Sequence, residues 1–296
     1  MKTLRALAIL ALPVVGHVRT TDACAAPQEP PPAFKVLVGP HTPIPGGGFF
    51  GSPRDPKIND ADHVVFRNFA GLYYVDDVQV LKVAEFGDPL ARGGSLEVAN
   101  ASYEINKHGQ VVFRSNIVNG GAGSGGGGVF VYEYATRSVS EVLRGGDAVE
   151  GLGELYNVFA ADINDAGVVV TLVSAQQGQR TGVVASSRVG GVWNHRTLIA
   201  NGDPALDTTG HWTNLRTYNL APTIHPSVAI NNAGLVAAPA GVQGDYRDDD
   251  NNVLTNVHDL CVVVVPLSGG PGSPASWARR STTAISRRPS SVPSSS

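Results

Sequence analysis

The sequence predicts an all-β protein, a β-propeller-like array of about four four-stranded units. Three observations indicate this fold. An Ile-Asn turn motif occurs four times, a Gly-Asp motif occurs three times in step with it, and 35 glycines and 20 prolines accompany only 16% charged residues. Such a composition suits many short strands joined by tight turns better than long surface helices. Four strands per ~45–60 residues is the period of β-propeller blades.

The Ile-Asn motif reads as the end of one strand, a tight turn and the start of a second strand. An Asn side chain can hydrogen-bond to the backbone two residues later and so begin a turn. The glycine three residues after Asn supplies the positive φ that closes a short hairpin. In the first copy Asp62 replaces this glycine, and Asp tolerates the left-handed region better than most residues. The four copies are "INDAD", "INKHG", "INDAG" and "INNAG", starting at Ile58, Ile105, Ile163 and Ile230.

The Gly-Asp motif marks the end of the last strand of a unit. A third apolar run, beginning with glycine, lies between the two motifs in each of the first three units. One unit therefore consists of a first strand ending in Ile-Asn, a second strand, a variable loop, a third strand beginning with Gly, and a fourth strand ending at Gly-Asp. The glycines of the third strands are Gly71, Gly128 and Gly182, and the aspartates are Asp88, Asp147 and Asp203.

The two ends of the repeat region predict how the array would close. The segment "FKVLVGP" resembles the last strand of a unit, with Gly39 in the glycine position and Pro40 in place of Asp. The fourth unit, in turn, has no convincing fourth strand after "DLCVVVVP" (259–266). We therefore expect residues 35–39 to pair with 260–266 and close a four-bladed ring, which would remove exposed sheet edges. An open array, or a fragment of a larger propeller, is the alternative.

The motifs also carry a family resemblance. The repeats "INDAG-V-V" and "INNAG-V-A", together with "GDP" and "PGGGFF", resemble the tandem repeats of secreted bacterial proteins of unknown function. The resemblance covers about residues 35–266 and implies an extracellular, β-propeller-like domain. It implies no catalytic residues, because that family offers none to carry over.

The ends of the chain predict export and a flexible tail. Residues 1–25 read as a signal peptide: Lys2 and Arg5 precede an apolar run too short to span a bilayer, and small residues follow around Cys24. A buried N-terminal helix is the alternative. Residues 26–33 read as a proline-rich linker, 34–268 as a single repeat β-domain, and 269–296 as a disordered Ser/Pro/Arg tail. Cleavage would leave Cys261 as the one remaining cysteine, so we expect no internal disulfide.

Three aspartates are the first candidate binding residues. Asp88, Asp147 and Asp203 occupy equivalent places in three units, so they would form a ring of carboxylates at the centre of a propeller. Such a ring would bind a cation or a basic ligand, or supply an acid–base pair for glycoside chemistry. The alternative is that each aspartate caps the turn after its own strand.

An acidic loop is the second candidate. Asp248, Asp250 and Asn252 stand at alternate positions, and Asp259 is the twelfth residue counted from Asp248, as in loops that bind calcium through oxygen ligands. Val253 stands where such a loop requires Gly, and Asp259 is shorter than the usual Glu. A solvated acidic turn is therefore the alternative.

Aromatic residues and the single remaining cysteine have simpler interpretations. The aromatics would form a carbohydrate platform if they were exposed, but their strand positions favour packing in the core. Cys261, within "LCVVVV", is interpreted as a core residue. The aromatic residues considered are Trp193, Trp212, Tyr73, Tyr74, Phe130 and Tyr132.

These features favour a secreted, non-enzymatic repeat protein that acts as a binding or structural module outside the cell. Its expected partner is a glycan, a cell wall or a protein, and calcium is the only cofactor that any motif suggests. A net charge of −3 predicts no nucleic-acid binding. We also expect a monomer without a transmembrane segment. The alternative function is an extracellular carbohydrate-active hydrolase or lyase that uses the central carboxylates.

Overall fold

A computed structural model describes most of the repeat region. The described residues are 36–69, 71–98, 102–120, 127–175, 179–204, 211–213, 227–247 and 253–267, with the backbone alone described for 211–213, 241–247 and 253–263. The predicted signal peptide, proline-rich linker and C-terminal tail lie outside these residues. All the strands belong to one compact unit of the chain, residues 37–296. In this described part, no helix has the length and hydropathy needed to cross a membrane.

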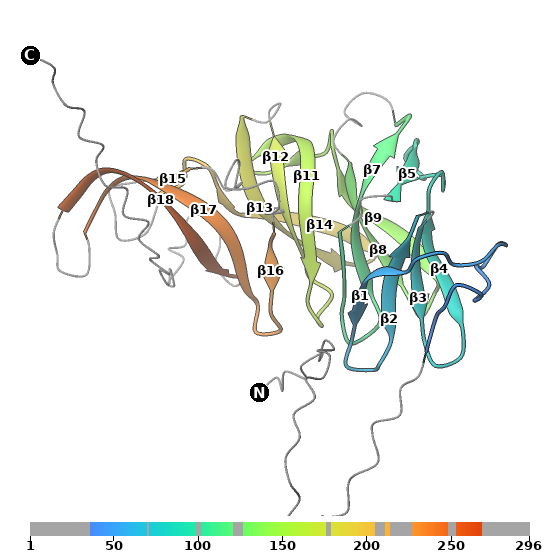
Figure 1. The fold of residues 1–296 in the computed structure, drawn as a ribbon. Helices are drawn as coiled ribbons and strands as arrows, with labels where there is room; N and C mark the ends of the chain where they lie inside the picture. The colour runs from blue at the N-terminus through green and yellow to red at the C-terminus, as the bar shows by residue number, and fades with distance from the viewer. Residues whose placement is uncertain are drawn as a thin grey trace, which may run out of the picture. The chain divides into compact units, whose positions relative to one another are not determined.

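The described strands form four antiparallel sheets that follow one another along the chain (Figure 1). We call these sheets the first to the fourth unit. In the first unit, four consecutive strands pair in chain order: β1 (Arg54–Ile58), β2 (Val64–Asn68), β3 (Gly71–Val75) and β4 (Val80–Glu85). The Ile-Asn turn joins β1 to β2 and the Gly-Asp motif follows β4, as the sequence predicts.

The second and third units repeat this meander with changes at the first strand. In the second unit the first strand is split into β5 and β6, which both pair with β7. In the third unit the short β10 forms a hairpin with the long first strand β11. The second unit comprises β5 (Ser95–Glu97), β6 (Tyr103–Ile105), β7 (Val111–Val118), β8 (Gly128–Glu133) and β9 (Ser138–Arg144). The third comprises β10 (Ala148–Val149), β11 (Gly153–Ile163), β12 (Val169–Ala175), β13 (Arg180–Val189) and β14 (Val192–Ala200).

The fourth unit is dominated by a long hairpin. The short strands β15 (His211–Thr213) and β16 (Ala229–Ile230) both pair with β17 (Leu235–Arg247), which pairs with β18 (Val253–Pro266). β15 reaches only as far as Gln243. From there to its tip, the backbone ladder of the described residues joins β17 and β18 alone.

Apolar cores join each unit to the next. Successive residues of a strand point to opposite faces, so every sheet contributes one set of side chains to the core before it and another to the core behind it. In β2, Val65 faces the second unit, whereas Phe66 lies on the opposite face. Equivalent buried residues join the second unit to the third and the third to the fourth. Four-stranded meanders that pack face to face in this way are the blades of a propeller-like fold.

The expected pairing of residues 35–39 with 260–266 is not found in the described part of the chain. Residues 37–39 form no strand, and β18 pairs with β17. Residues 37–50 instead form a loop whose Val38 and Ile44 pack on the outer face of the first unit beside Phe50. Of the apolar side chains that a closing strand would have used, Val38 packs on this face, whereas Val36 and Leu37 are exposed.

This loop also corrects the expected register of the N-terminal segment. Phe50 N donates to the Thr42 carbonyl at 3.1 Å, as Leu96 N donates to the Asp88 carbonyl at 2.9 Å. The Thr42 hydroxyl also accepts a hydrogen bond from Gly39 N at 2.9 Å. Thr42 therefore takes the aspartate position that the sequence analysis gave to Pro40, because a hydroxyl oxygen can replace a carboxylate as the acceptor of a turn.

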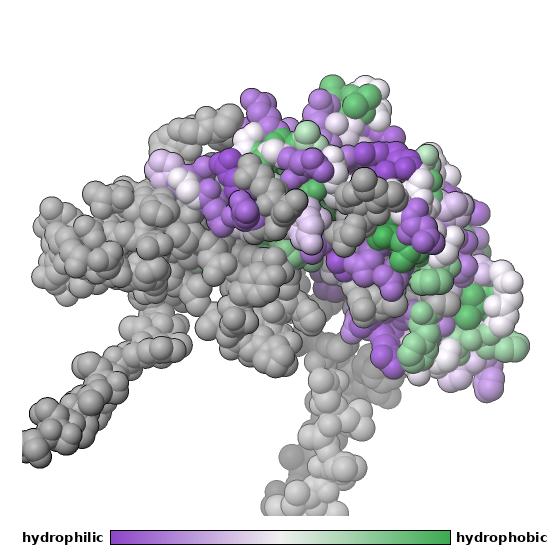
Figure 2. Space-filling view, turned by 90° about the horizontal axis from the view of Figure 1, so that it is seen from above, coloured by the Kyte–Doolittle hydropathy of each residue, from purple (hydrophilic) through white to green (hydrophobic). Residues whose placement is uncertain are grey.

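The visible surface is mixed in character. Among the residues coloured in Figure 2, hydrophilic side chains predominate and hydrophobic ones form small separate groups. Exposed apolar side chains that are scattered in this way are normal for a folded domain.

Candidate functional site

The asparagine of each Ile-Asn motif organises its own turn. Its side-chain oxygen accepts hydrogen bonds from the backbone amides two and four residues later, at 3.0–3.1 Å in the first three units. The residue that closes the turn has a positive φ in every copy, including Asp62 at 60° and Gly167 at 74°. The predicted turn is therefore confirmed in atomic detail.

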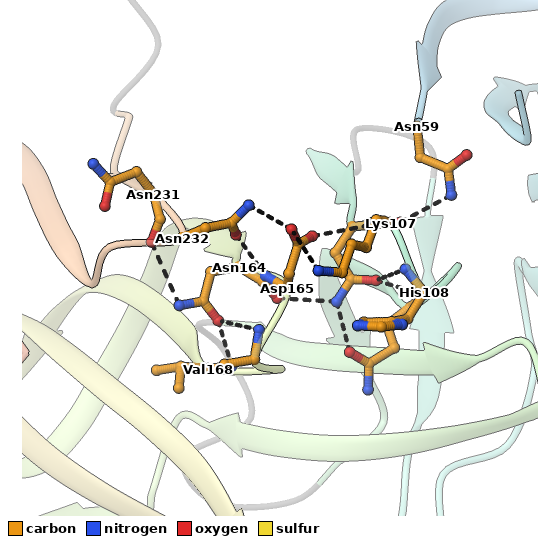
Figure 3. A network of polar contacts seen from close by, with 11 residues as sticks. Asn59, Lys107, His108, Asn164, Asp165, Val168, Asn231 and Asn232 are labelled. Carbon is orange, nitrogen blue, oxygen red and sulfur yellow. Dashed lines mark hydrogen bonds and ion pairs between the residues drawn. The ribbon is translucent and has the colours of Figure 1, made fainter. Parts of the chain in front are cut away.

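The same asparagines also join the units to one another (Figure 3). The side-chain nitrogen of Asn59 donates to the Asn106 carbonyl at 2.9 Å, and that of Asn106 donates to the Asn164 carbonyl at 2.9 Å. The side-chain nitrogen of Asn164 lies 3.5 Å from the Asn231 carbonyl. Asn59, Asn106 and Asn164 are almost fully buried. We call this series of contacts the asparagine ladder.

A second row of contacts runs beside the ladder, through the residue that follows each asparagine (Figure 3). Lys107 N donates to the Asp165 carboxylate at 3.1 Å, and Asp165 N donates to the Asn232 side-chain oxygen at 2.9 Å. The Asn232 side-chain nitrogen donates back to Asp165. Burial alone would raise the pKa of the Asp165 carboxyl, but the hydrogen bonds and charge of Lys107 and the hydrogen bond from Asn232 outweigh it and lower this pKa.

A buried carboxylate reinforces the junction between the third and fourth units. The Asp162 carboxylate accepts hydrogen bonds from Ile163 N and from Ile230 N, both at 2.8 Å. Burial raises the pKa of this carboxyl, although the two amides counteract the increase. The acid therefore acts as a bridge between two units.

The three aspartates of the Gly-Asp motifs lie in separate turns. Asp88, Asp147 and Asp203 each accept a hydrogen bond at 2.8 Å from the backbone amide three residues earlier. Each also has a different cationic neighbour: Lys82, Arg92 and Arg180, respectively. These contacts are the ones expected if each aspartate caps the turn after its own strand.

Asp147 additionally belongs to a cluster of charged residues at the second unit. Arg92, from the loop after β4, contacts Glu141 at 2.8 Å and also contacts Asp147. Arg144 donates to the backbone carbonyl of Arg92 at 2.7 Å. Burial raises the pKa of Glu141, although Arg144 and Arg92 oppose the increase. Sequence reasoning did not identify this cluster, because its members are up to 55 residues apart.

Three aromatic rings and a carboxylate meet where the first two units join. The His63 ring nitrogen lies 2.5 Å from the Tyr74 hydroxyl, and the Tyr74 and Tyr134 rings stack with centroids 4.8 Å apart. Tyr134 donates to Asp76 at 2.7 Å. Burial would raise the pKa of Asp76, but hydrogen bonds from Tyr134, Val78 and Gln79 lower it to about 2. His63 and Tyr134 are half-buried, so the cluster reaches the surface.

Most of the candidate platform aromatics are core residues. Tyr73, Tyr74, Phe130 and Tyr132 are fully buried, as the core interpretation predicts. Trp193 is partly buried against the core between the second and third units. The side chains of Trp212 and Cys261 lie outside the described residues.

The calcium candidates lie largely outside the described residues. Asp248, Asp250 and Asn252 are not described, and Asp259 is described by its backbone alone. Asp259 pairs with Val242 inside β18, six residues beyond Val253. At about 3.3 Å per strand residue this is about 20 Å from the loop. The calcium site therefore stays a prediction. In the described residues, no three His, Cys, Asp or Glu side chains form a metal-binding group.

Comparisons with known proteins find one family and several solved structures. The model of a family of unknown function (DUF7453) matches residues 63–265. No curated protein matches the sequence. The chain is similar to an α-L-arabinanase of Penicillium chrysogenum, complexed with arabinobiose, with 9% identity, a TM-score of 0.37, and 76% of this chain and 64% of that chain covered.

Two further solved structures are similar at the same level. A protein provisionally assigned as a gluconolactonase has 12% identity and a TM-score of 0.33, covering 70% of this chain and 63% of that chain. PorZ, a surface component of the type-IX secretion system of Porphyromonas gingivalis, has 11% identity and a TM-score of 0.38, covering 74% of this chain and 32% of that chain. The chain spans less than two thirds of the length of each of the three.

Proposed function

The chain belongs to a family of unknown function (DUF7453), and we propose that it is a secreted, non-enzymatic repeat protein, a binding or structural module outside the cell. One observation carries the proposal. Asp88, Asp147 and Asp203, the repeated carboxylates, each accept a hydrogen bond from a backbone amide of their own turn. Carboxylates held in separate turns support a scaffold role, whereas acid–base chemistry on a glycoside needs two of them in one site.

The β17–β18 hairpin is the proposed recognition element. Its strands have 13 and 14 residues, whereas β2 and β3 have five each. Beyond Gln243 its backbone ladder is two-stranded in the described part of the chain, so the hairpin extends past the sheet that supports it. Functional segments are commonly variable loops on a rigid scaffold.

A binding screen tests the proposal. The purified protein is applied to a glycan array and to isolated bacterial cell walls, beside a variant in which Asn-Gly replaces residues 245–256. Asn-Gly suits a two-residue hairpin between Gly244 and Val257, which already pair. We expect the wild type to bind at least one glycan or wall preparation and the shortened variant to lose that binding. A variant that lacks residues 121–126 of the β7–β8 loop is the matched control and should still bind.

An activity assay addresses the alternative of a carbohydrate-active enzyme. Glu141, whose pKa burial raises even though Arg144 and Arg92 oppose the increase, is a carboxylic acid suited to donate a proton. The protein is incubated with the polysaccharides that it binds, beside Glu141→Gln. We expect no release of sugar by either protein. Release that is lost in Glu141→Gln would establish the enzyme and overturn the proposal.

A further inference from the structure

The asparagine ladder has a direction, and its two ends differ. Each asparagine side chain donates to the carbonyl of the following unit. At the fourth unit, Asn231 is exposed, and its side-chain nitrogen has no acceptor among the described residues. At the first unit, the Asn59 carbonyl accepts the amide of Asp62 in its own turn, but no asparagine side chain among the described residues donates to it. The fourth unit is thus a donor end and the first unit an acceptor end.

The second row of contacts also has a donor end at the fourth unit and an acceptor end at the first unit. In that row, the residue that follows one asparagine donates its backbone amide to the side-chain oxygen of the residue that follows the next asparagine. Lys107 N donates to the Asp165 carboxylate in this way. At the donor end, the next amide in the series is that of Asn232. At the acceptor end, the equivalent side chain is Asp60, an exposed carboxylate of the same type as Asp165. Asp60 therefore has the chemistry to accept the amide of Asn232.

Apolar residues at the first unit also mark a missing neighbour. The preceding unit covers the isoleucines before the other asparagines: Ile163 and Ile230 are 6% and 9% exposed, and Ile105 is half-buried. Ile58, in the same position of the first unit, is 65% exposed. The loop 37–50 does not prevent docking here, because Phe50 takes the place that Leu96 takes inside an existing junction.

On the outer face of the fourth unit, apolar residues are less buried than their equivalents in the other three units. Val65, Val112 and Val170, the sixth residues after their asparagines, are fully buried under the following unit. Ala237, which stands in the same position of the fourth unit, is only half-buried. Its cross-strand neighbour Val264 is half-buried as well. Ile58 at one end, and Ala237 with Val264 at the other, are thus apolar residues that are less buried than most of their equivalents in the existing junctions.

We propose that the donor end of one copy of this chain docks on the acceptor end of a second copy. The Asn231 side chain of one copy then donates to the Asn59 carbonyl of the other, and Asn232 N donates to the Asp60 carboxylate. Ile58 and Ala237 meet in a core that continues the three existing ones. Two copies contribute eight units, and closed β-propellers have up to eight blades. The two arrays then close into one ring, in which the same head-to-tail contact forms twice. This interface goes beyond the proposed function and does not involve residues 245–256, the tip of the hairpin that the binding screen removes.

Sedimentation of the purified protein tests the proposal. We expect the wild type to form a two-copy species as its concentration rises, and Ile58→Asp and Ala237→Asp each to sediment as single copies. Val189→Asp is the matched control, because Val189 is also 65% exposed but lies at the end of β13. It should behave like the wild type. Asn231→Asp, at an exposed position of the donor end, replaces Ala237→Asp if that variant fails to fold.

Mixing the two variants distinguishes a second copy from closure within one chain. The Ile58→Asp copy keeps its donor end and the Ala237→Asp copy keeps its acceptor end. An equimolar mixture should therefore regain a two-copy species with one of each. A wild type that stays a single copy at all concentrations would overturn the proposal, as would variants that associate as the wild type does or a mixture that stays separate.

Discussion

The side-chain nitrogen of Asn106 lies 2.9 Å from the carbonyl oxygen of Asn164, 58 residues further along the chain and in the next unit. The same nitrogen donates to the Gln110 side chain at 2.6 Å, and the side-chain oxygen accepts the amides of His108 and Gln110. One amide group thus satisfies its own turn and joins two units. This dual use explains why the motif needs an amide rather than a carboxylate.

Asn106→Asp should destabilise the protein strongly. The substitution preserves the oxygen that accepts the turn amides but places a buried negative charge against two acceptor oxygens. We expect the free energy of unfolding to fall by about 3 kcal/mol. Urea denaturation measures the change. Asn231→Asp is the matched control, since Asn231 is exposed at the end of the ladder, and it should cost less than about 0.5 kcal/mol. Both are made in the Ile58→Asp background, so that single copies are compared. Equal losses would contradict the role of the ladder.

Gly109→Ala should cost more than Gly234→Ala, although both glycines have a φ of 76°. A positive φ strains any side chain by about 1–2 kcal/mol. At Gly109 the added carbon would also lie 2.6 Å from the Tyr74 hydroxyl, whereas at Gly234 its nearest neighbour is Leu267 at 3.5 Å. We expect a difference of about 1–3 kcal/mol in the free energy of unfolding. Equal losses would mean that the junction between the first two units yields to the added carbon.

Removal of the turn-capping aspartates should reduce stability unequally. Asp203→Ala removes one hydrogen bond to a backbone amide and a 3.9 Å contact with Arg180, at a site that is 42% exposed and solvent-screened, and should cost about 1 kcal/mol. Asp147→Ala removes the equivalent hydrogen bond and also the contact with Arg92, at a side chain only 16% exposed. We expect about 2–3 kcal/mol, because Arg92 loses a charged partner. Chemical denaturation of the two variants in parallel tests the ranking, and the reverse order would contradict it.

Asp76 should make stability depend on pH in the acidic range. Its pKa in the folded protein is about 2, below the ordinary value of 3.8. The folded state therefore favours the ionised form. The resulting stability, about 2 kcal/mol, is fully present above pH 4 and is lost as the pH falls through 2. In Asp76→Asn, the difference from the wild type in the free energy of unfolding should shrink over the same window. A difference that stays constant between pH 5 and 2 would show that Asp76 is not the group concerned.

The strands and turns could be predicted from the sequence because their causes are local. Asn164, Gly167 and the valines that follow act within a few residues of one another, so the motif determines its own hairpin. The capping of the Gly-Asp turns is local as well, and it was one of the two stated alternatives. The predicted register of the N-terminal segment was wrong. Thr42 replaces the aspartate as the acceptor of the turn, and a threonine is not part of the Gly-Asp motif.

The contacts between units could not be predicted in the same way. They join residues 47, 58 and 67 positions apart, and their geometry depends on how the sheets pack. One signal in the sequence does point to them. Asn occurs in all four motifs, whereas the glycine position accepts Asp62. An aspartate could accept the turn amides equally well, so the strict use of Asn indicates that the side chain must also donate.

The asparagine ladder allows the units of the array to differ in length. The contact between two asparagines is made at one end of the sheets, while the chain between them varies from 47 to 67 residues. Insertions elsewhere in a unit therefore leave the joint between neighbours unchanged. Whole units could be duplicated, removed or exchanged as cassettes, with an asparagine and one backbone carbonyl as the common coupling.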